Sequence, residues 1–262
     1  MSFDANEPVA VTMTGAVADV EIRRAREHNA IDIETAQALL QCCRALRDGD
    51  SARAVVLSGA GMSFGVGGDL NELASDSTNV ARKLIGILHE AVSLLLAIDA
   101  PVIAKLRGRV AGGSMSLSLA CDLAVASSDT KFNFAYANAG TTADVGGSWH
   151  LPYIVGLRNA MEIALLSETI DADRARALGI VNQVVPDGQL DAAVDALAHR
   201  LAQGPTRAFG RMKRLLRGAL SSPLDTQLAA EMGCFVESTR TADFAEALAA
   251  FLSKRAPRFA GR

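Results

Sequence analysis

The sequence lacks three features that would assign it to a common class at once: a cysteine–histidine cluster, a block of like charge, and a long apolar run. Its longest apolar stretch, AVSLLLAIDAPVIA, is interrupted by Asp99 and Pro101 and is too short to cross a bilayer. The net charge is −3, with acids and bases mixed along the chain. We therefore expect neither a nucleic acid nor a membrane surface as a partner.

Cysteine is scarce and is not spaced for a structural role. The four cysteines are Cys42, Cys43, Cys121 and Cys234. They lack the spacing of a zinc site, so we expect no bound metal and four reduced, buried thiols. The first residues, MSFDANEPVAV, contain acids and no cationic apolar run, which is not the pattern of a secretory leader. Together these features favour a cytoplasmic protein.

Nucleotide-binding motifs are absent as well. The chain contains neither a GK[ST] phosphate loop nor a G-x-G-x-x-G turn, so the usual nucleotide folds are disfavoured. What is present is a large apolar fraction, because half of the 262 residues are hydrophobic. A chain of this length can bury about 70–75% of its unfolded surface in one large domain.

Strand-like runs alternate with helical patterns up to about residue 157, and helices follow. PVAVTMTGAVADVEI predicts a hairpin around Gly15, and DIETAQALLQCCRAL predicts a helix that Asp32 caps. Residues 79–98 predict a long helix, and the remaining strands are ARAVVLSG, PVIAKLRG, CDLAVAS, KFNFAY and VNQVV. The pattern predicts an α/β fold with a core over residues 1–200 and a helical C-terminal region over 201–262. That region has little core of its own to cover, so a partner subunit is expected.

Two glycine-rich turns precede helices. In SFGVGGDLNEL we expect Asp69 to cap a helix, with Glu72 completing a capping box. In GRVAGGSMSLSLACD a strand ends, Gly112 and Gly113 form the turn, and a helix begins at about Ser114. Each turn could be only a tight corner. Two backbone N–H donors that converge on one point would instead form an oxyanion hole, which suits acyl chemistry.

The stretch NAGTTADVGGSWH contains one acid, Asp144, with no lysine or arginine nearby. Its apolar surroundings suggest a pKa raised by loss of hydration. Asp144 could be a catalyst, or it could cap a helix that begins at Gly146 or Gly147. Trp149 and His150 are expected to pack that helix.

Four motifs resemble those of the enoyl-CoA hydratase/isomerase (crotonase) superfamily, and the resemblance covers essentially the whole chain. They are SGAGMSFGVGGDLNEL, APVIAKLRGRVAGGSMSLSLACDLAVAS, KFNFAYANAGTTADVGGSWHLPYIVG and ARALGIVNQVVP. The resemblance implies a crotonase-type spiral of ββα turns, with the C-terminal helices forming trimers or hexamers made of two trimers. It also implies coenzyme A thioesters as substrates and no permanently bound cofactor.

The resemblance implies roles for several residues. The N–H groups of Gly68 and Gly113 would hold the thioester oxygen. Phe251 and Lys254 could close over coenzyme A from a neighbouring subunit. The adenosine end of coenzyme A would lie along His28, Ala30 and the turn that comprises Val66, Gly67, Gly68, Asp69 and Leu70.

The departures from the family pattern favour isomerisation over hydration. The two glutamates of the hydratases fall at Ser116 and Tyr136 here, so efficient hydration of a simple enoyl-CoA is not expected. Asp144 falls where a subset of isomerases carries its acid, and the chain resembles most the ring-epoxide isomerases of phenylacetyl-CoA breakdown, which also isomerise Δ3-enoyl-CoA. We expect Asp144 to shuttle one proton between two carbons of the acyl chain.

Two alternatives stay open. Chlorobenzoyl-CoA dehalogenases resemble this chain in an aspartate aligned with Asp144 and a histidine aligned with His89, which would make Asp144 a nucleophile and His89 the base for water. Those enzymes have a tryptophan at the position that aligns with Tyr136, and we expect Tyr136 to form a wall of the pocket. The protein could also be a non-catalytic acyl-CoA-binding member. LNELASDSTNVARKL and the helix after it are expected to shape the acyl pocket.

Overall fold

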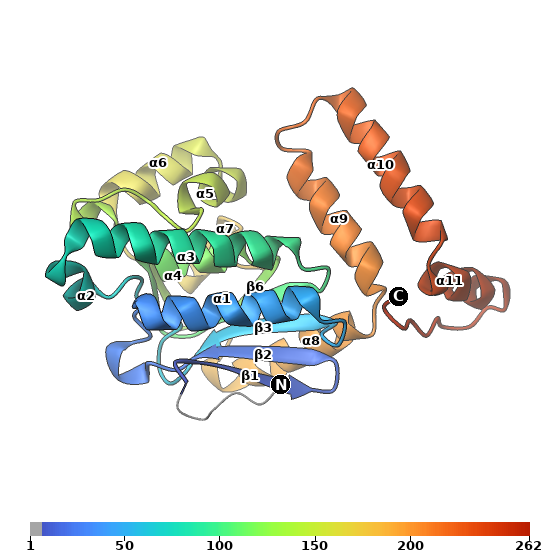
Figure 1. The fold of residues 1–262 in the computed structure, drawn as a ribbon, viewed down its shortest axis with the longest axis horizontal. Coiled ribbons are helices and arrows are strands. Elements are labelled where there is room, and N and C mark those ends of the chain that lie inside the picture. Colours follow the sequence, from blue (N-terminus) through green and yellow to red (C-terminus); the bar gives the residue numbers. More distant parts are fainter. Residues whose placement is uncertain (1–6) are drawn as a thin grey trace.

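The computed structural model describes residues 7–262. Residues 1–6, which make up most of the segment MSFDANEPVAV in which we expect no secretory leader, lie outside this range. Six strands form the main sheet, in the order β1-β2-β3-β4-β6-β9 (Figure 1). β1 and β2 are antiparallel, as the predicted hairpin requires, and the other neighbours are parallel. The strands are β1 (Val9–Thr14), β2 (Val17–Ile22), β3 (Ala54–Gly59), β4 (Val102–Leu106), β6 (Leu123–Ser127) and β9 (Gln183–Val185).

A second sheet of three short strands stands beside the first, in the order β5-β7-β8. Its strands are β5 (Arg109–Ala111), β7 (Lys131–Asn133) and β8 (Ile170–Asp171). The sequence predicts only β7, and predicts it too long, since the strand covers three residues of KFNFAY. β5 and β8 are too short to show a two-residue periodicity.

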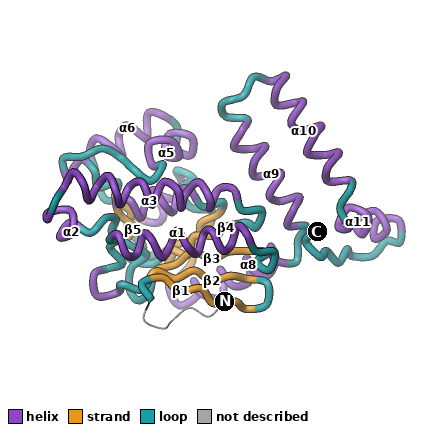
Figure 2. Tube along the Cα trace, viewed as in Figure 1, coloured by secondary structure: helices purple, strands orange, loops and turns teal. Residues whose placement is uncertain are grey.

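Helices cover both faces of the main sheet (Figure 2). On one face α1 (Ile33–Asp48) and α3 (Ser77–Ala97) share a large core with β2 and β3. On the other face α8 (Leu190–Ala202) places Leu190 and Val194 against Val56, Ile103 and Val125. The remaining helices are α2 (Leu70–Ser75), α4 (Gly112–Ala120), α5 (Gly147–Val155), α6 (Leu157–Leu166), α7 (Ala172–Ala177), α9 (Thr206–Gly218), α10 (Leu224–Thr239) and α11 (Ala242–Leu252).

The two predicted helix caps are confirmed, but the capping box is wrong. Asp32 accepts a hydrogen bond from the Thr35 N–H at the start of α1, and Asp69 accepts from the second and third residues of α2. The Glu72 carboxylate does not accept a hydrogen bond from the Asp69 N–H, as a capping box would require. Its carboxylate accepts instead from the Ile33 N–H, at 2.9 Å. Glu72 thus caps α1 and ties α2 to it.

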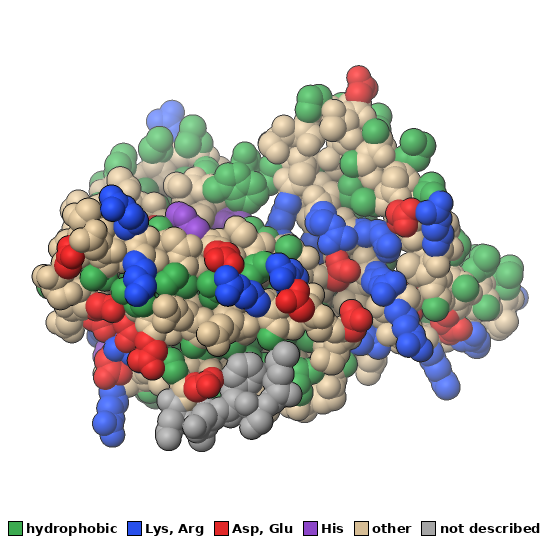
Figure 3. Space-filling view, in the orientation of Figure 1, with side chains coloured by type: hydrophobic (Ala, Val, Ile, Leu, Met, Phe, Trp, Pro, Cys, Tyr) green, Lys and Arg blue, Asp and Glu red, His purple; other side chains and the backbone are tan. Residues whose placement is uncertain are grey.

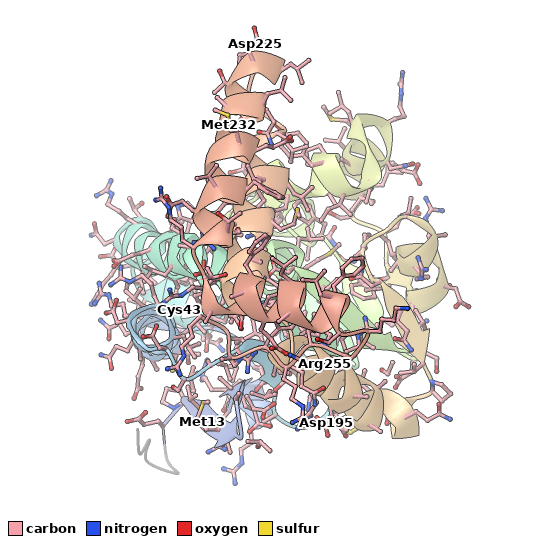
Figure 4. All side chains as sticks on the ribbon, turned by 90° about the vertical axis from the view of Figure 1, so that its right-hand side faces the viewer. Met13, Cys43, Asp195, Asp225, Met232 and Arg255 are labelled. Atoms are coloured by element: carbon pink, nitrogen blue, oxygen red, sulfur yellow. The ribbon has the colours of Figure 1, made fainter. Side chains whose placement is uncertain are left out.

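The last three helices form an arm that projects from the sheet (Figures 1 and 4). α9 is held to the body by Lys213, whose ammonium group donates to the carbonyls of Ile98 and Ala100 and pairs with Asp122 at 2.7 Å. Further out the arm carries exposed apolar side chains, several of which Figure 3 shows in green. They are Leu224, Leu228, Met232, Phe235, Leu248, Phe251 and Leu252. The division of the chain at residue 200 and the assembly into trimers or hexamers remain predictions.

The cysteines are free, as expected, but their expected burial holds for only two of them. Cys42 and Cys43 are buried on α1, whereas Cys121 and Cys234 are partly exposed. Within residues 7–262, no helix is long and apolar enough to span a membrane.

Candidate active site

An apolar cavity of about 710 Å³ opens between the two glycine turns, α3 and the segment that follows β7. It is lined by Val66, Gly67, Gly68, Leu70, Leu73, Ser77, Thr78, Ala81, Leu84, Ile85, Gly112, Gly113, Ala135, Tyr136, Asn138, Ala139, Thr141 and Asp144. Asp144 is the one acidic residue on this wall, and none of the lining residues is basic. A second cavity of about 360 Å³ lies near the C-terminus and shares no residue with the first.

The two glycine turns touch each other at the floor of the cavity. A Cβ on Gly67 would lie 2.9 Å from the Gly113 nitrogen, closer than real Cβ atoms approach, and Gly67 has a φ of +93°. Only glycine therefore fits this contact without strain. The Gly67 N–H donates to the Ser114 hydroxyl at 3.0 Å, which fixes the first turn to the helix that follows the second.

The Gly68 N–H points away from Ile31, the residue with which Gly68 forms a backbone bridge. In the parallel bridge between Ile31 and Gly68, the bonds are made by the Gly67 carbonyl and the Asp69 N–H. The groups of Gly68 itself therefore point to the other side of the backbone. Gly113 is the second residue of α4, so its N–H has no acceptor within the helix and lies at the positive end of the helix dipole. The two donors expected to form an oxyanion hole thus lie on the wall of one cavity.

Asp144 lies beside this pair of turns. Its Oδ1 is 3.4 Å from the position that a Cβ on Gly113 would take. Tyr136 donates from its hydroxyl to the same Oδ1 at 2.5 Å, and that hydroxyl is 2.8 Å from the Ser116 Oγ. The alternative in which Asp144 caps a helix is wrong, because α5 begins at Gly147 with Gly146 as N-cap and no side-chain cap.

Burial raises the pKa of the Asp144 carboxyl above its ordinary value, while the Tyr136 hydrogen bond and the His89 ring lower it. The net effect is a raised pKa of Asp144, as its apolar neighbours in the sequence suggested. Burial, with the charge of Asp144 second, raises the pKa of Tyr136, so its hydroxyl remains a neutral donor. The site therefore holds one carboxylate that takes up a proton more readily than an exposed aspartate.

The peptide after Asp144 has an unusual conformation. Val145 is buried and has a φ of +52°, a left-handed conformation that is disfavoured for a β-branched residue. Its N–H donates to the His89 Nε2 at 3.3 Å. This hydrogen bond makes Nε2 an acceptor, which places the proton of a neutral ring on Nδ1. His89 is thus close to Asp144 but does not line the cavity.

Of the other candidate residues, Val66, Gly67 and Leu70 line the cavity. Their contact with the adenosine end of coenzyme A remains a prediction. Ser116 does not line the cavity, because its side chain is fully buried behind Tyr136.

Asp69 does not line the cavity either: its carboxylate caps α2 and pairs with Arg24 at 3.0 Å. His28 is exposed and Ala30 is buried, and both precede the segment that pairs with Gly68. Phe251 and Lys254 lie on or just after α11, exposed to solvent and outside the cavity of their own chain. Their expected contact therefore requires a second copy.

Trp149 and His150 lie on α5 and do not line the cavity. His150 is buried, and burial lowers its pKa to about 4, so it packs as a neutral ring. Trp149 is about two-fifths exposed and stacks edge-on against His150 and Tyr153. Both residues pack the helix, as expected.

Sequence reasoning missed one wall of the cavity. This wall comes from the segment and the short turn that follow β7, and its residues are Ala135, Asn138, Ala139 and Thr141. These residues are small and carry no chemical signature, so only the path of the backbone brings them to the site. The opposite wall, from Leu70 to Leu84, lies where the sequence predicted the acyl pocket.

No group of three or more His, Cys, Asp or Glu side chains that could hold a metal occurs among residues 7–262. The titratable groups on the cavity wall are the Asp144 carboxylate and the Tyr136 hydroxyl, which donates to it.

Comparison with known proteins agrees with this geometry. The family model described as enoyl-CoA hydratase/isomerase matches residues 12–262. A probable enoyl-CoA hydratase of Rhodobacter capsulatus is 37% identical, over 80% of this chain and 82% of that protein. A 1,2-epoxyphenylacetyl-CoA isomerase of Escherichia coli is 34% identical (94% and 95%), and a 4-chlorobenzoyl coenzyme A dehalogenase-2 of an Arthrobacter species is 33% identical (97% and 94%). A solved structure of a putative enoyl-CoA hydratase/isomerase from Mycobacterium abscessus superposes with a TM-score of 0.92 at 34% identity, over 97% of this chain and 100% of the other.

Proposed function

Since the chain belongs to the enoyl-CoA hydratase/isomerase (crotonase) family and is therefore an acyl-CoA enzyme, we propose that it is an acyl-CoA isomerase with Asp144 as its proton shuttle. The observation that carries the proposal is that Asp144 is the one acid on the cavity wall and lies beside Gly113. Hydration needs a base for water and an acid for the α-carbon, and only one such group is present.

The proposed reaction moves a double bond from the β,γ to the α,β position. The Asp144 carboxylate takes a proton from Cα. The electron pair of the broken C–H bond forms a double bond between Cα and the thioester carbon, and the carbonyl π electrons move to the thioester oxygen, which gives a dienolate that still contains the β,γ double bond. The N–H groups of Gly68 and Gly113 stabilise this oxyanion. The carboxyl group then returns its proton to Cγ, the electrons shift back, and the thioester carbonyl re-forms. Nothing is oxidised and no water is consumed.

The carboxylate suits this task because of its environment. Burial raises the pKa of Asp144, which makes the carboxylate a stronger base than an exposed aspartate. Its Tyr136 hydrogen bond keeps the ionised form populated. The similarity to a 1,2-epoxyphenylacetyl-CoA isomerase supports isomerisation as the reaction class, and suggests that a ring-containing acyl group is a substrate to test.

The nucleophilic alternative has less support from the site. In that reaction Asp144 would attack the substrate and His89 would activate water. His89 does not line the cavity, and its Nε2 already accepts the Val145 N–H. Single turnover in ¹⁸O-water would place the label in the Asp144 side chain if this alternative held.

The function is tested by incubating the protein with a β,γ-enoyl-CoA in D₂O and following the acyl protons by NMR. We expect the α,β-enoyl-CoA to form, with deuterium entering at Cα or Cγ. A 3-hydroxyacyl-CoA product would instead indicate hydration. Binding by calorimetry without turnover of any acyl-CoA in a panel would support the non-catalytic alternative.

The apolar wall from α3 predicts a selectivity for acyl length. Ala81 lines the cavity, and Ala81→Trp would fill part of it. We expect KM for a ten-carbon enoyl-CoA to rise at least about tenfold, because a misfit of one methylene group in an apolar pocket already costs 10-fold or more. KM for a four-carbon substrate should change little. Arg82→Ala, at the adjacent exposed position, is the matched control. Equal losses for both substrates would place the acyl chain elsewhere.

A further inference from the structure

Tyr136 lies at the centre of a chain of three hydrogen-bonding groups, which runs from Ser116 through Tyr136 to Asp144. Its hydroxyl is 2.8 Å from the Ser116 Oγ and 2.5 Å from the Asp144 Oδ1. Tyr136 is buried, and its ring stands edge-on against Phe134. The chain thus runs from the cavity wall into the core and ends at Ser116.

Chemistry fixes the direction of these hydrogen bonds. An ionised carboxylate can only accept, so Tyr136 must donate its single proton to Asp144. The Ser116 hydroxyl must then donate to Tyr136. The Ser116 Oγ lies close to Gly147, where an added Cβ would be 2.2 Å from it, and Tyr136 is the side chain to which its hydroxyl is hydrogen-bonded. Both hydroxyl groups therefore donate in the direction of Asp144: Ser116 donates to Tyr136, and Tyr136 donates to Asp144.

We propose that Tyr136 is a positioning residue that engages Oδ1 of Asp144 and leaves Oδ2 as the oxygen that takes the proton from the substrate and returns it. This inference rests on the proposed function. Among residues 7–262 no protein group donates a hydrogen bond to Oδ2, whereas Oδ1 accepts the Tyr136 proton. The oxygen without a donor is the more basic one. Oδ1, held by Tyr136 next to Gly113, keeps the carboxylate from rotating about its terminal torsion.

The principal variant is Tyr136→Phe, which removes the hydroxyl and keeps the ring. We expect kcat/KM to fall about 10- to 100-fold, the factor that corresponds to losing a hydrogen bond to a charged group. The reduction should appear in kcat, with KM nearly unchanged. Because Tyr136 lowers the pKa of Asp144, the variant should also lose activity at a higher pH than the wild type as the pH falls. Tyr153→Phe is the matched control, since Tyr153 is the only other tyrosine and lies half-exposed on α5.

A second variant separates positioning from packing. Tyr136→Phe leaves the Ser116 hydroxyl buried without an acceptor, so its Tm should fall by about 2–4 °C. The double variant Ser116→Ala/Tyr136→Phe removes the buried Ser116 hydroxyl as well, and Tm should return towards the wild-type value. We expect kcat and the acidic limb of the pH profile to stay as in Tyr136→Phe. Recovery of kcat together with Tm would show that Tyr136 acts only by packing, and would overturn the proposal.

A measurement without substrate distinguishes this proposal from the function on which it rests. The Asp144 carboxyl carbon can be followed by ¹³C NMR in protein labelled at aspartate, with Asp144→Asn to assign the signal. We expect its titration midpoint to move to higher pH in Tyr136→Phe and not in Tyr153→Phe. An unmoved midpoint would overturn the role of Tyr136 even if the wild type isomerises its substrate. A moved midpoint in a protein that does not isomerise would support the contact while the proposed function failed.

Discussion

Asp144→Asn is expected to abolish measurable isomerisation and proton exchange, with a loss of about 10²- to 10⁴-fold or more, the usual contribution of a positioned acid–base group. Asparagine has nearly the same shape, and its carbonyl oxygen can still accept the Tyr136 hydrogen bond that Oδ1 accepts now. The fold and the cavity should therefore persist. Only the ability to take and return a proton is removed.

The measurement is the rate of deuterium entry into a β,γ-enoyl-CoA, beside the affinity for the same ligand by calorimetry. We expect affinity within a fewfold of the wild type. Asp173→Asn, at an exposed position in α7, controls for the loss of one acid. Exchange that survives Asp144→Asn would mean that another group moves the proton, and the proposed mechanism would fail.

Gly67→Ala is expected to have the second-largest effect. The new Cβ would meet the Gly113 nitrogen at 2.9 Å, and alanine at a φ of +93° is strained in any case. The two turns must move apart, and with them the N–H groups of Gly68 and Gly113. Since removing one oxyanion donor costs about 10²–10³ in kcat, we expect a loss of at least that size.

The control for this substitution is Gly86→Ala on α3, where the added Cβ meets nothing within 4 Å. That variant should keep full activity and gain about 0.5–1 kcal/mol, because alanine favours a helix. Circular dichroism and thermal melts establish whether Gly67→Ala is folded. A folded Gly67→Ala protein with wild-type kcat would exclude the two turns as the oxyanion-binding element.

The parts of the fold that sequence could predict are those with a local physical signal. The hairpin around Gly15, the Asp32 cap and the long helix α3 each follow from periodicity or capping within a few residues. The strands β5 and β8 could not be predicted, because β5 lies in the glycine-rich segment directly before α4 and β8 consists of two residues between two helices. The role of Glu72 was predicted wrongly for another reason. Its spacing from Asp69 fits a capping box, but in the folded chain its carboxylate accepts a hydrogen bond from the free Ile33 N–H at the start of α1.

The residues of the candidate site can likewise be separated into those with a local signal in the sequence and those without one. The glycine turns and Asp144 are visible in the sequence because glycine before a helix and an isolated acid are chemically distinctive. Ser116 falls at a glutamate position of the family, which predicts that it contacts the substrate, yet it lies behind Tyr136. The wall made by Ala135 and Ala139 depends on the course of the chain between β7 and α5, which no local pattern encodes.

The left-handed Val145 has a consequence for engineering the protein. A buried β-branched residue at a φ of +52° costs of order 1–3 kcal/mol, and glycine at this position would relieve much of that strain. Removing the buried valine side chain, however, would forfeit about 1.5–3 kcal/mol of apolar burial, which is as large as the strain relieved. Val145→Gly should therefore bring no gain in heat resistance, while it frees the backbone next to Asp144. The valine thus holds the peptide beside the carboxylate in a conformation that the chain would not adopt without the surrounding core.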